Sequence, residues 1–215
     1  LNPLVVLLGK GEHQITSSWI SPDSSLSETT LAIARSNITF VGKGKDTTRI
    51  LGGFGIENLE NITFKNMKVT NTIDLGDGIC MSNAKVELFD VALKGCNRHA
   101  LYISRSSSET TVVVATRCEF SKSEYGAAID GSLTSATFNN CVFKDNDLDG
   151  MYAYESTIHL HGDVTAIHSN GRHGIIAHLS SKVILHLPSH HNTSYNNGDE
   201  DRHTLYEGTI TNVED

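Results

Sequence analysis

Residues 145–156, DNDLDGMYAYES, place carboxylates at a spacing close to that of a calcium-binding loop. The EF-hand loop alternates acidic ligands, turns at a glycine and needs a bidentate glutamate at its twelfth position. Here Glu155 lies at the eleventh position and Ser156 at the twelfth, so the match fails by one residue. We therefore interpret the segment as a turn and expect no metal and no other cofactor, with surface calcium as the alternative. The ligands of such a calcium site would be Asp145, Asp147 and Asp149.

A second set of polar and aromatic residues recurs at intervals of about 24 residues. If these repeats are stacked strands, Asp130, Tyr154 and His178 share one outward position on consecutive strands, about 4.8 Å apart. A carboxylate, a phenol and an imidazole in one line could transfer protons, so we predict these three as catalytic candidates. Side chains around them could stack on sugar rings and hold hydroxyl or carboxylate groups. These predicted ligand-binding residues are Arg98, His99, Tyr102, Tyr152, Arg172 and His173. The alternative is a solvated sheet face of mixed polar residues.

Three further histidines, His159, His161 and His186, lie on or beside the first strand of a repeat. His161 and His186 occupy the same position on adjacent repeats, and they could hold zinc if a third ligand came near. The alternative, which we favour, is an incidental surface pair.

The four cysteines leave the redox compartment open. Cys118 and Cys141 point inward on adjacent repeats, within reach of a disulfide, but buried cysteine also packs as a small apolar side chain, and we favour the second interpretation. Cys80 is expected to face outward and Cys96 to lie in a turn.

The elements that must position all these residues are short strands that repeat along the chain. Each repeat of about 24 residues contains three segments in which apolar residues alternate, so it has no room for a helix. The first column is Ile38/Phe40, Ile62/Phe64, Val86/Leu88, Val112/Val114, Ala136/Phe138, Ile158/Leu160 and Val183/Leu185. The second column is Met67/Val69, Val91/Leu93, Cys118/Phe120, Cys141/Phe143 and Val164/Ala166. The third column is Ile79/Met81, Leu101/Ile103, Ala127/Ile129, Met151/Ala153 and Ile175/Ala177.

This pattern predicts an all-β fold, a right-handed parallel β-helix of about seven turns with three short strands per turn. We expect a single domain over residues 1–215, with a cap and first turn at 1–35, stacked turns at 36–187 and a C-terminal cap or tail at 188–215. Four aligned glycines enter the third strand, where we expect an unusual bend: Gly78, Gly126, Gly150 and Gly174. Asn146 and Asn170 precede two of them, and we expect both asparagines to be left-handed.

Composition and charge exclude some classes of partner. The formal net charge of −8 argues against nucleic acid, whose binding rests on a basic surface. The apolar run Leu4–Leu8 is far too short to span a membrane. The oligomeric state stays open.

The strand columns resemble the right-handed parallel β-helix superfamily, which includes pectate lyases, polygalacturonases, alginate epimerases and phage tailspikes. The resemblance extends from about Leu31 to Leu187 and rests on the NITF, C-x-F and G-x-x-x columns. It implies action on acidic polysaccharides along the groove of one sheet face. The catalytic signatures of these enzymes are mostly missing: there is no R-x-P-x-x-R, W-x-D-H or D-P-H. NTID at 71–74 and RHG at 172–174 only approach the N-T-D and G-H-G of polygalacturonases.

Three functions remain after this comparison. We favour a carbohydrate-binding or surface module that recognises a polysaccharide along one sheet face. The first alternative is a lyase, epimerase or hydrolase on an acidic glycan, although the net charge of −8 disfavours such a substrate unless calcium intervenes. The second alternative is a purely structural solenoid. Whether the protein is an enzyme stays open, and the resemblance implies a place outside the cell or on a cell or virion surface.

Overall fold

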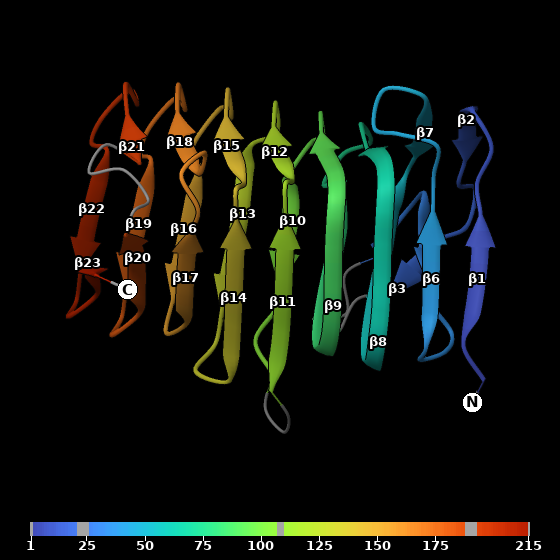
Figure 1. Ribbon diagram of the computed structural model, residues 1–215, viewed down its shortest axis with the longest axis horizontal. Coiled ribbons are helices and arrows are strands. Elements are labelled where there is room, and N and C mark those ends of the chain that lie inside the picture. Colours follow the sequence, from blue (N-terminus) through green and yellow to red (C-terminus); the bar gives the residue numbers. More distant parts are fainter. Residues whose placement is uncertain (1, 21–25, 107–109, 188–192, 215) are drawn as a thin grey trace.

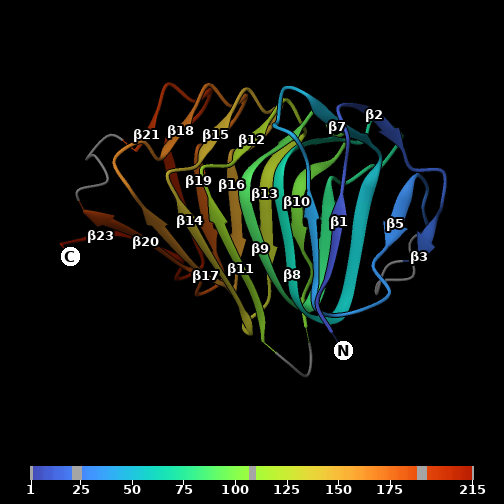
Figure 2. The ribbon, with the colours of Figure 1, turned by 45° about the vertical axis from the view of Figure 1, so that its right-hand side comes forward.

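The computed structural model describes residues 2–20, 26–106, 110–187 and 193–214. The described residues contain strands and turns but no helix. All pairings between the strands are parallel except in one short hairpin, and successive strands wind around a common core (Figures 1 and 2). The predicted β-solenoid of about seven turns is therefore confirmed.

Three faces run along the rod, and we name them after the order of their strands in each turn (Figure 2). Two long strands, β8 (Gly53–Thr70) and β9 (Ile79–Lys94), bend through all three faces. The first-strand face also holds β1 (Leu4–Leu7), β6 (Ile38–Val41), β11 (Thr111–Thr116), β14 (Thr134–Asn139), β17 (Thr157–His161), β20 (Lys182–Leu187) and β23 (Thr209–Glu214). The second-strand face holds β2 (Gly11–Gln14), β7 (Thr48–Leu51), β12 (Glu119–Ser121), β15 (Val142–Lys144), β18 (Ala166–His168) and β21 (Ser194–Tyr195). The third-strand face holds β5 (Thr30–Ala32), β10 (His99–Ile103), β13 (Tyr125–Asp130), β16 (Met151–Tyr154), β19 (Ile175–His178) and β22 (Arg202–Leu205).

The core is built from the apolar columns that the alternation predicts. Phe120 and Phe143 are fully buried, pair in register and stack with ring centroids 4.6 Å apart. Phe138 meets both rings edge-on from the first-strand face. Such stacking of like residues on consecutive turns fixes the register of the parallel strands, because a slip of one residue would turn the whole apolar set outward.

In two of the predicted columns, one strand is assigned wrongly by one residue. Val113 and Ala115 face the core, whereas Val112 and Val114 face outward. This strand contains three valines in a row, so its sequence carries no alternation that would choose a face. In the next column Ile167 is buried in register with Phe143, while Val164 is 63% exposed.

The stacked strands extend into residues 1–35 and also beyond residue 187. At the C-terminal end β21, β22 and β23 pair in parallel with the preceding turn, where we expected a cap or tail. Part of that expected tail, residues 188–192, lies outside the described residues. At the N-terminal end the hairpin of β3 (Trp19–Ile20) and β4 (Leu26–Ser27) brings the Trp19 indole against Gly55. Cys80 pairs with Gly55 and with Tyr102, so it belongs to the outward column as expected, but it is nevertheless buried.

A buried asparagine ladder connects the turns that lead into the third strands. The Asn146 side-chain amide donates to Asn170 Oδ1 at 2.8 Å, and the Asn170 amide donates to Asn197 Oδ1 at the same distance. The expected left-handed conformation is wrong for these asparagines, since it belongs to the residues just before them, Asp145 and Ser169. The asparagines are needed for hydrogen bonds between turns, not for their own backbone angles.

The glycines at the third strands are needed for close approach and not for an unusual bend. None of Gly78, Gly126, Gly150 and Gly174 has a positive φ angle. A Cβ atom on Gly150 would lie 2.6 Å from Asn170 Nδ2 and 2.8 Å from the Gly174 carbonyl oxygen. Glycine therefore lets the next turn pack directly against the backbone.

Candidate functional site

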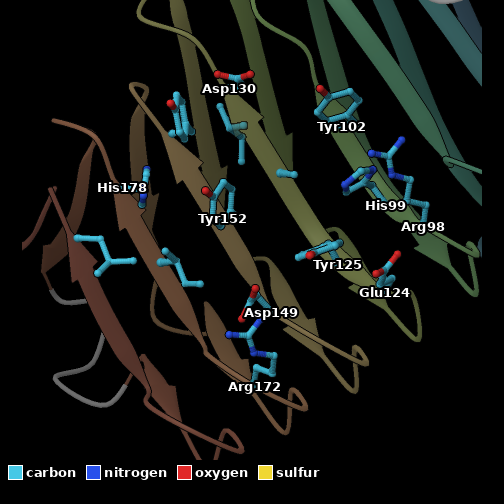
Figure 3. A pocket seen from close by; sticks show the side chains of 15 residues that line it. Arg98, His99, Tyr102, Glu124, Tyr125, Asp130, Asp149, Tyr152, Arg172 and His178 are labelled. Carbon is cyan, nitrogen blue, oxygen red and sulfur yellow. The ribbon is translucent and has the colours of Figure 1, made fainter. Parts of the chain in front are cut away.

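The third-strand face carries a pocket of about 510 Å³ that spans several turns (Figure 3). Four of the chain's six tyrosines line it, together with two arginines and three carboxylates. The lining consists of Arg98, His99, Tyr102, Glu124, Tyr125, Ala128, Ile129, Asp130, Asp149, Tyr152, Tyr154, Arg172, Ile176, His178 and Leu205. All the predicted catalytic and ligand-binding residues except His173 thus lie around one pocket.

The strand register accounts for this convergence. Asp130 of β13 pairs with Tyr154 of β16, which pairs with His178 of β19, so the three predicted catalytic residues form one column. Tyr102 and Tyr152 belong to the neighbouring outward column. Side chains two residues apart on a strand point to the same face, which is why both columns line the pocket.

Ring contacts hold the aromatic side chains of this face in place. The His99 ring stacks between Tyr102 and Tyr125, with centroids 4.8 and 5.2 Å away. The His178 ring stacks on Tyr154 at 5.0 Å. The pocket therefore presents two groups of packed rings, one toward β10 and one toward β19.

Asp130 is engaged by a residue that the sequence analysis missed. Arg105 lies just after β10, and its guanidinium group is 3.3 Å from Asp130 Oδ1 and 3.0 Å from Glu155 Oε2. The same group lies over the Tyr154 ring, 5.5 Å from its centroid. Since half of the Arg105 side chain is exposed, these pairs contribute little to stability. They do place a positive charge beside the predicted catalytic column, because the Arg105 guanidinium group lies next to Asp130.

Two Asp–His pairs lie at the entry to the third strands. His99 Nδ1 is 2.8 Å from Asp77 Oδ1, and His173 Nδ1 is 2.9 Å from Asp149 Oδ1. A carboxylate can only accept, so Nδ1 carries a proton in both rings, and in the neutral ring Nε2 is the acceptor. His99 lines the pocket in this orientation. Asp77 was not predicted, although it occupies the same D-G position before Gly78 as Asp149 does before Gly150.

His173 is separated from the ligand-binding set predicted from the sequence. Its side chain is buried, as is that of His99, but its ring packs against His203 with centroids 4.8 Å apart, whereas His99 stacks on the pocket tyrosines. Alternation places His173 and His99 at equivalent positions, but it cannot tell which of the two rings borders the pocket.

The phenols of the pocket are hydrogen-bond donors at neutral pH. Burial raises the pKa of Tyr152 above its usual value, and the neighbouring Tyr154 and Asp130 raise it further. Burial and the Glu124 carboxylate likewise raise the pKa of Tyr125. On the opposite side of the pocket, His178 Nδ1 is buried and has no hydrogen-bond partner among the described residues. A bound ligand would thus meet the protonated phenols of Tyr125 and Tyr152.

The metal and cysteine candidates lie elsewhere in the fold. Asp145 and Asp147 are exposed, whereas Asp149 is buried against His173, so the three carboxylates differ in environment. Among the described residues, the group whose ligand atoms converge is His159, His161 and His186 on the first-strand face.

The four cysteines are buried thiols that form no disulfide. Burial raises the pKa of Cys96 to about 12, which leaves this thiol unreactive as a nucleophile at neutral pH. In the part of the chain that the structure describes, no helix is long and apolar enough to cross a membrane.

Three solved structures align with this chain at low sequence identity. ORF18 of Geobacillus virus E2 aligns with a TM-score of 0.53 and 13% identity over 98% of this chain and 52% of that one, so this chain spans about half its length. The A-module of the Azotobacter vinelandii mannuronan C-5 epimerase AlgE6 aligns at 12% identity over 97% of this chain and 90% of its own, with a TM-score of 0.32. The A-module of the Azotobacter vinelandii mannuronan C-5 epimerase AlgE4 aligns at 12% identity over 94% of this chain and 70% of its own, with a TM-score of 0.34. At 13% identity, the alignment with ORF18 indicates the fold alone.

Comparison at the sequence level identifies the family. No curated protein matches the chain. The family described as right-handed β-helix region matches twice, over residues 32–163 and 77–213, and these two matches together cover most of the sequence. They agree with the parallel register of the strands and with the resemblance seen in the apolar columns. The chain therefore belongs to the right-handed β-helix family.

Proposed function

We propose that this β-helix is a carbohydrate-binding surface module that recognises a polysaccharide along its third-strand face. The observation that carries the proposal is the gathering of four of the six tyrosines around one pocket of about 510 Å³. Sugar rings offer apolar C–H faces to aromatic rings and hydroxyl groups to polar side chains, so this lining matches both kinds of surface. A linear polymer would meet related contacts on consecutive turns.

The charges around the pocket favour a neutral glycan over a polyuronate. Three lining carboxylates face two lining guanidinium groups, and Arg172 already lies 3.6 Å from Asp199. A uronate chain would need more unpaired positive charge, or a bridging cation, to offset this balance. Recognition of polysaccharide would place the module outside the cell or on a cell or virion surface.

The test is a glycan array followed by titration calorimetry with the strongest ligand. The double variant Tyr152→Ala, Tyr154→Ala should bind that ligand roughly tenfold or more weakly, since each aromatic contact contributes about 0.5–1.5 kcal/mol beyond area burial. Tyr195→Ala is the matched control, because Tyr195 stacks on His168 on the second-strand face and does not line the pocket. Unchanged affinity in a folded double variant would mean that the ligand binds elsewhere.

A second candidate, a polysaccharide-active enzyme, is favoured by the Asp77–His99 pair. Asp77 holds the His99 ring with Nε2 as a potential proton acceptor, and the adjacent Tyr125 phenol is a protonated donor. Assays for new reducing ends and for unsaturated products separate the two functions. Turnover that is lost in His99→Gln, with binding retained, would favour the enzyme. Binding without product would favour the module, and neither binding nor product would leave a structural solenoid.

A further inference from the structure

Three imidazoles meet on the first-strand face, on the other side of the core from the tyrosine pocket. β17 and β20 lie side by side there (Figure 1), and alternation turns His159 and His161 outward on β17 and His186 outward on β20. Leu160 pairs with Leu185, so His161 and His186 are the next pair in register. Their ring centroids are 3.8 Å apart.

The third histidine approaches this pair diagonally. His159 Nδ1 is 2.9 Å from His186 Nε2, and one ring nitrogen of each histidine lies within 4.8 Å of the corresponding nitrogens of the other two. All three side chains are half-buried, so they are held by the strands while still reachable from solvent. The third ligand, which the sequence did not identify, is thus His159, on the same strand as His161.

This spacing is close to that of a metal site. Zn–N bonds of about 2.0–2.1 Å in tetrahedral geometry separate the ligand nitrogens by about 3.3 Å. One pair of nitrogens is already nearer than this and the rest lie within 4.8 Å, so small rotations of the rings suffice and the strands need not move. A bound ion would replace the proton that His159 and His186 now share.

The surroundings of the three rings decide the kind of ion. The positions paired with His159 and His161 on the preceding turn are Thr137 and Asn139, and Val213 pairs with His186 on the following turn. None of these three paired positions carries a charge, so none of them repels a cation or offers a carboxylate to calcium. Imidazole nitrogen suits zinc and the neighbouring first-row metals, whereas calcium requires oxygen ligands.

We infer that His159, His161 and His186 bind one Zn²⁺ ion, or a related divalent first-row transition metal, with the remaining coordination positions occupied by water. The site joins two consecutive turns of the rod. A set of three histidines with an open position has the composition of zinc sites that keep an exchangeable ligand, not that of closed structural sites.

The test is calorimetric titration of ZnCl₂ alone into the full chain without a polyhistidine tag, at pH 7.5. We expect one ion per chain, and we expect His161→Gln and His186→Gln each to weaken binding at least tenfold. His168→Gln is the matched control, since His168 stacks on Tyr195 on the second-strand face and should leave zinc affinity unchanged. Circular dichroism checks the fold of each variant, and the zinc-dependent rise in melting temperature should disappear in the same two variants.

Three results would overturn the inference. The first is a wild-type chain that does not bind zinc. The second is zinc affinity that is equal in wild type, His161→Gln and His186→Gln. The third is zinc binding that is lost in the double variant His190→Gln, His191→Gln but retained in the His161 and His186 variants. Positions 190 and 191 lie outside the described residues.

Discussion

Replacing Asn170 with alanine should destabilise the β-helix by about 2–6 kcal/mol, because its side chain connects three consecutive turns. The Asn170 amide donates to Asn197 Oδ1 at 2.8 Å and to the Phe143 carbonyl at 3.3 Å. Its Oδ1 accepts from the Asn146 side-chain amide at 2.8 Å and from the Asn146 backbone N–H at 3.2 Å. Asn170 and Asn146 are both buried, so the two Asn146 donors lose their partner without gaining water. Each such donor costs about 1–3 kcal/mol.

The assay is urea denaturation of the wild type and the variant, compared at their midpoints with the slope checked for change. Asn197→Ala serves as the control, since Asn197 is less buried and water can replace part of what it loses. We expect the Asn197 variant to lose less stability than the Asn170 variant. A loss below about 1 kcal/mol for Asn170→Ala would refute the reasoning, because it would mean that the ladder does not hold the turns together.

Asn170→Asp adds a pH dependence whose sign follows from the same contacts. In the folded variant the new carboxylate would face two acceptors, Asn197 Oδ1 and the Phe143 carbonyl, in a buried position. Burial and these acceptors disfavour the charged form, and together they outweigh the two Asn146 donors at the other oxygen, so the folded-state pKa lies above the unfolded value of about 3.9. The folded state then holds the proton more tightly, and the variant loses stability as pH rises from about 4 through its folded pKa. The denaturation midpoint of Asn170→Asp should be lower at pH 7 than at pH 4, and Asn170→Ala should not show this difference.

Three further changes test other parts of the fold. Phe143→Ala should cost about 3–5 kcal/mol, since the ring is fully buried against Phe120, and a midpoint shift worth less than about 1 kcal/mol would contradict that packing. Gly150→Ala should cost about 1–3 kcal/mol by overpacking against the next turn, while Gly9→Ala, with open space around it, should be nearly neutral; equal midpoints would show that the close approach is unimportant. Cys96 should resist alkylation at pH 8 until the protein is unfolded in urea, because burial raises the pKa of its thiol to about 12, and rapid labelling of the folded chain would contradict this.

The fold was predictable because the same constraint is repeated on every turn. A parallel stack needs an apolar side chain at the same inward position of each strand, so columns such as Phe120 and Phe143 stand out at constant spacing. The prediction slipped where a strand offered apolar residues to both faces, as at Val112–Val114, or where an exposed valine imitated the pattern, as at Val164. There the register is chosen by neighbouring turns, and a single segment does not contain that information.

The candidate site was predictable only in part, for a related reason. Alternation names the outward column of Asp130, Tyr154 and His178, since these positions follow from strand register alone. It does not show that Arg105, which lies after the end of β10, reaches back to Asp130. It also does not show that the His173 ring packs against His203 and does not line the pocket. Residues on strands inherit their place from the repeat, whereas loops and burial depend on the particular neighbours.

The separation of the two proposed sites makes their tests independent. The zinc ligands lie on β17 and β20 of the first-strand face, and the tyrosines on β16 and neighbouring strands of the third-strand face, with the buried columns between them. Packed sheets stand about 10 Å apart, a distance beyond which substitutions without shared partners act additively. Combining His161→Gln with Tyr152→Ala and Tyr154→Ala should therefore reproduce the separate losses of zinc and glycan affinity. A zinc affinity that depends on the tyrosines would instead mean that a change on one face is transmitted through the stacked phenylalanine core to the other.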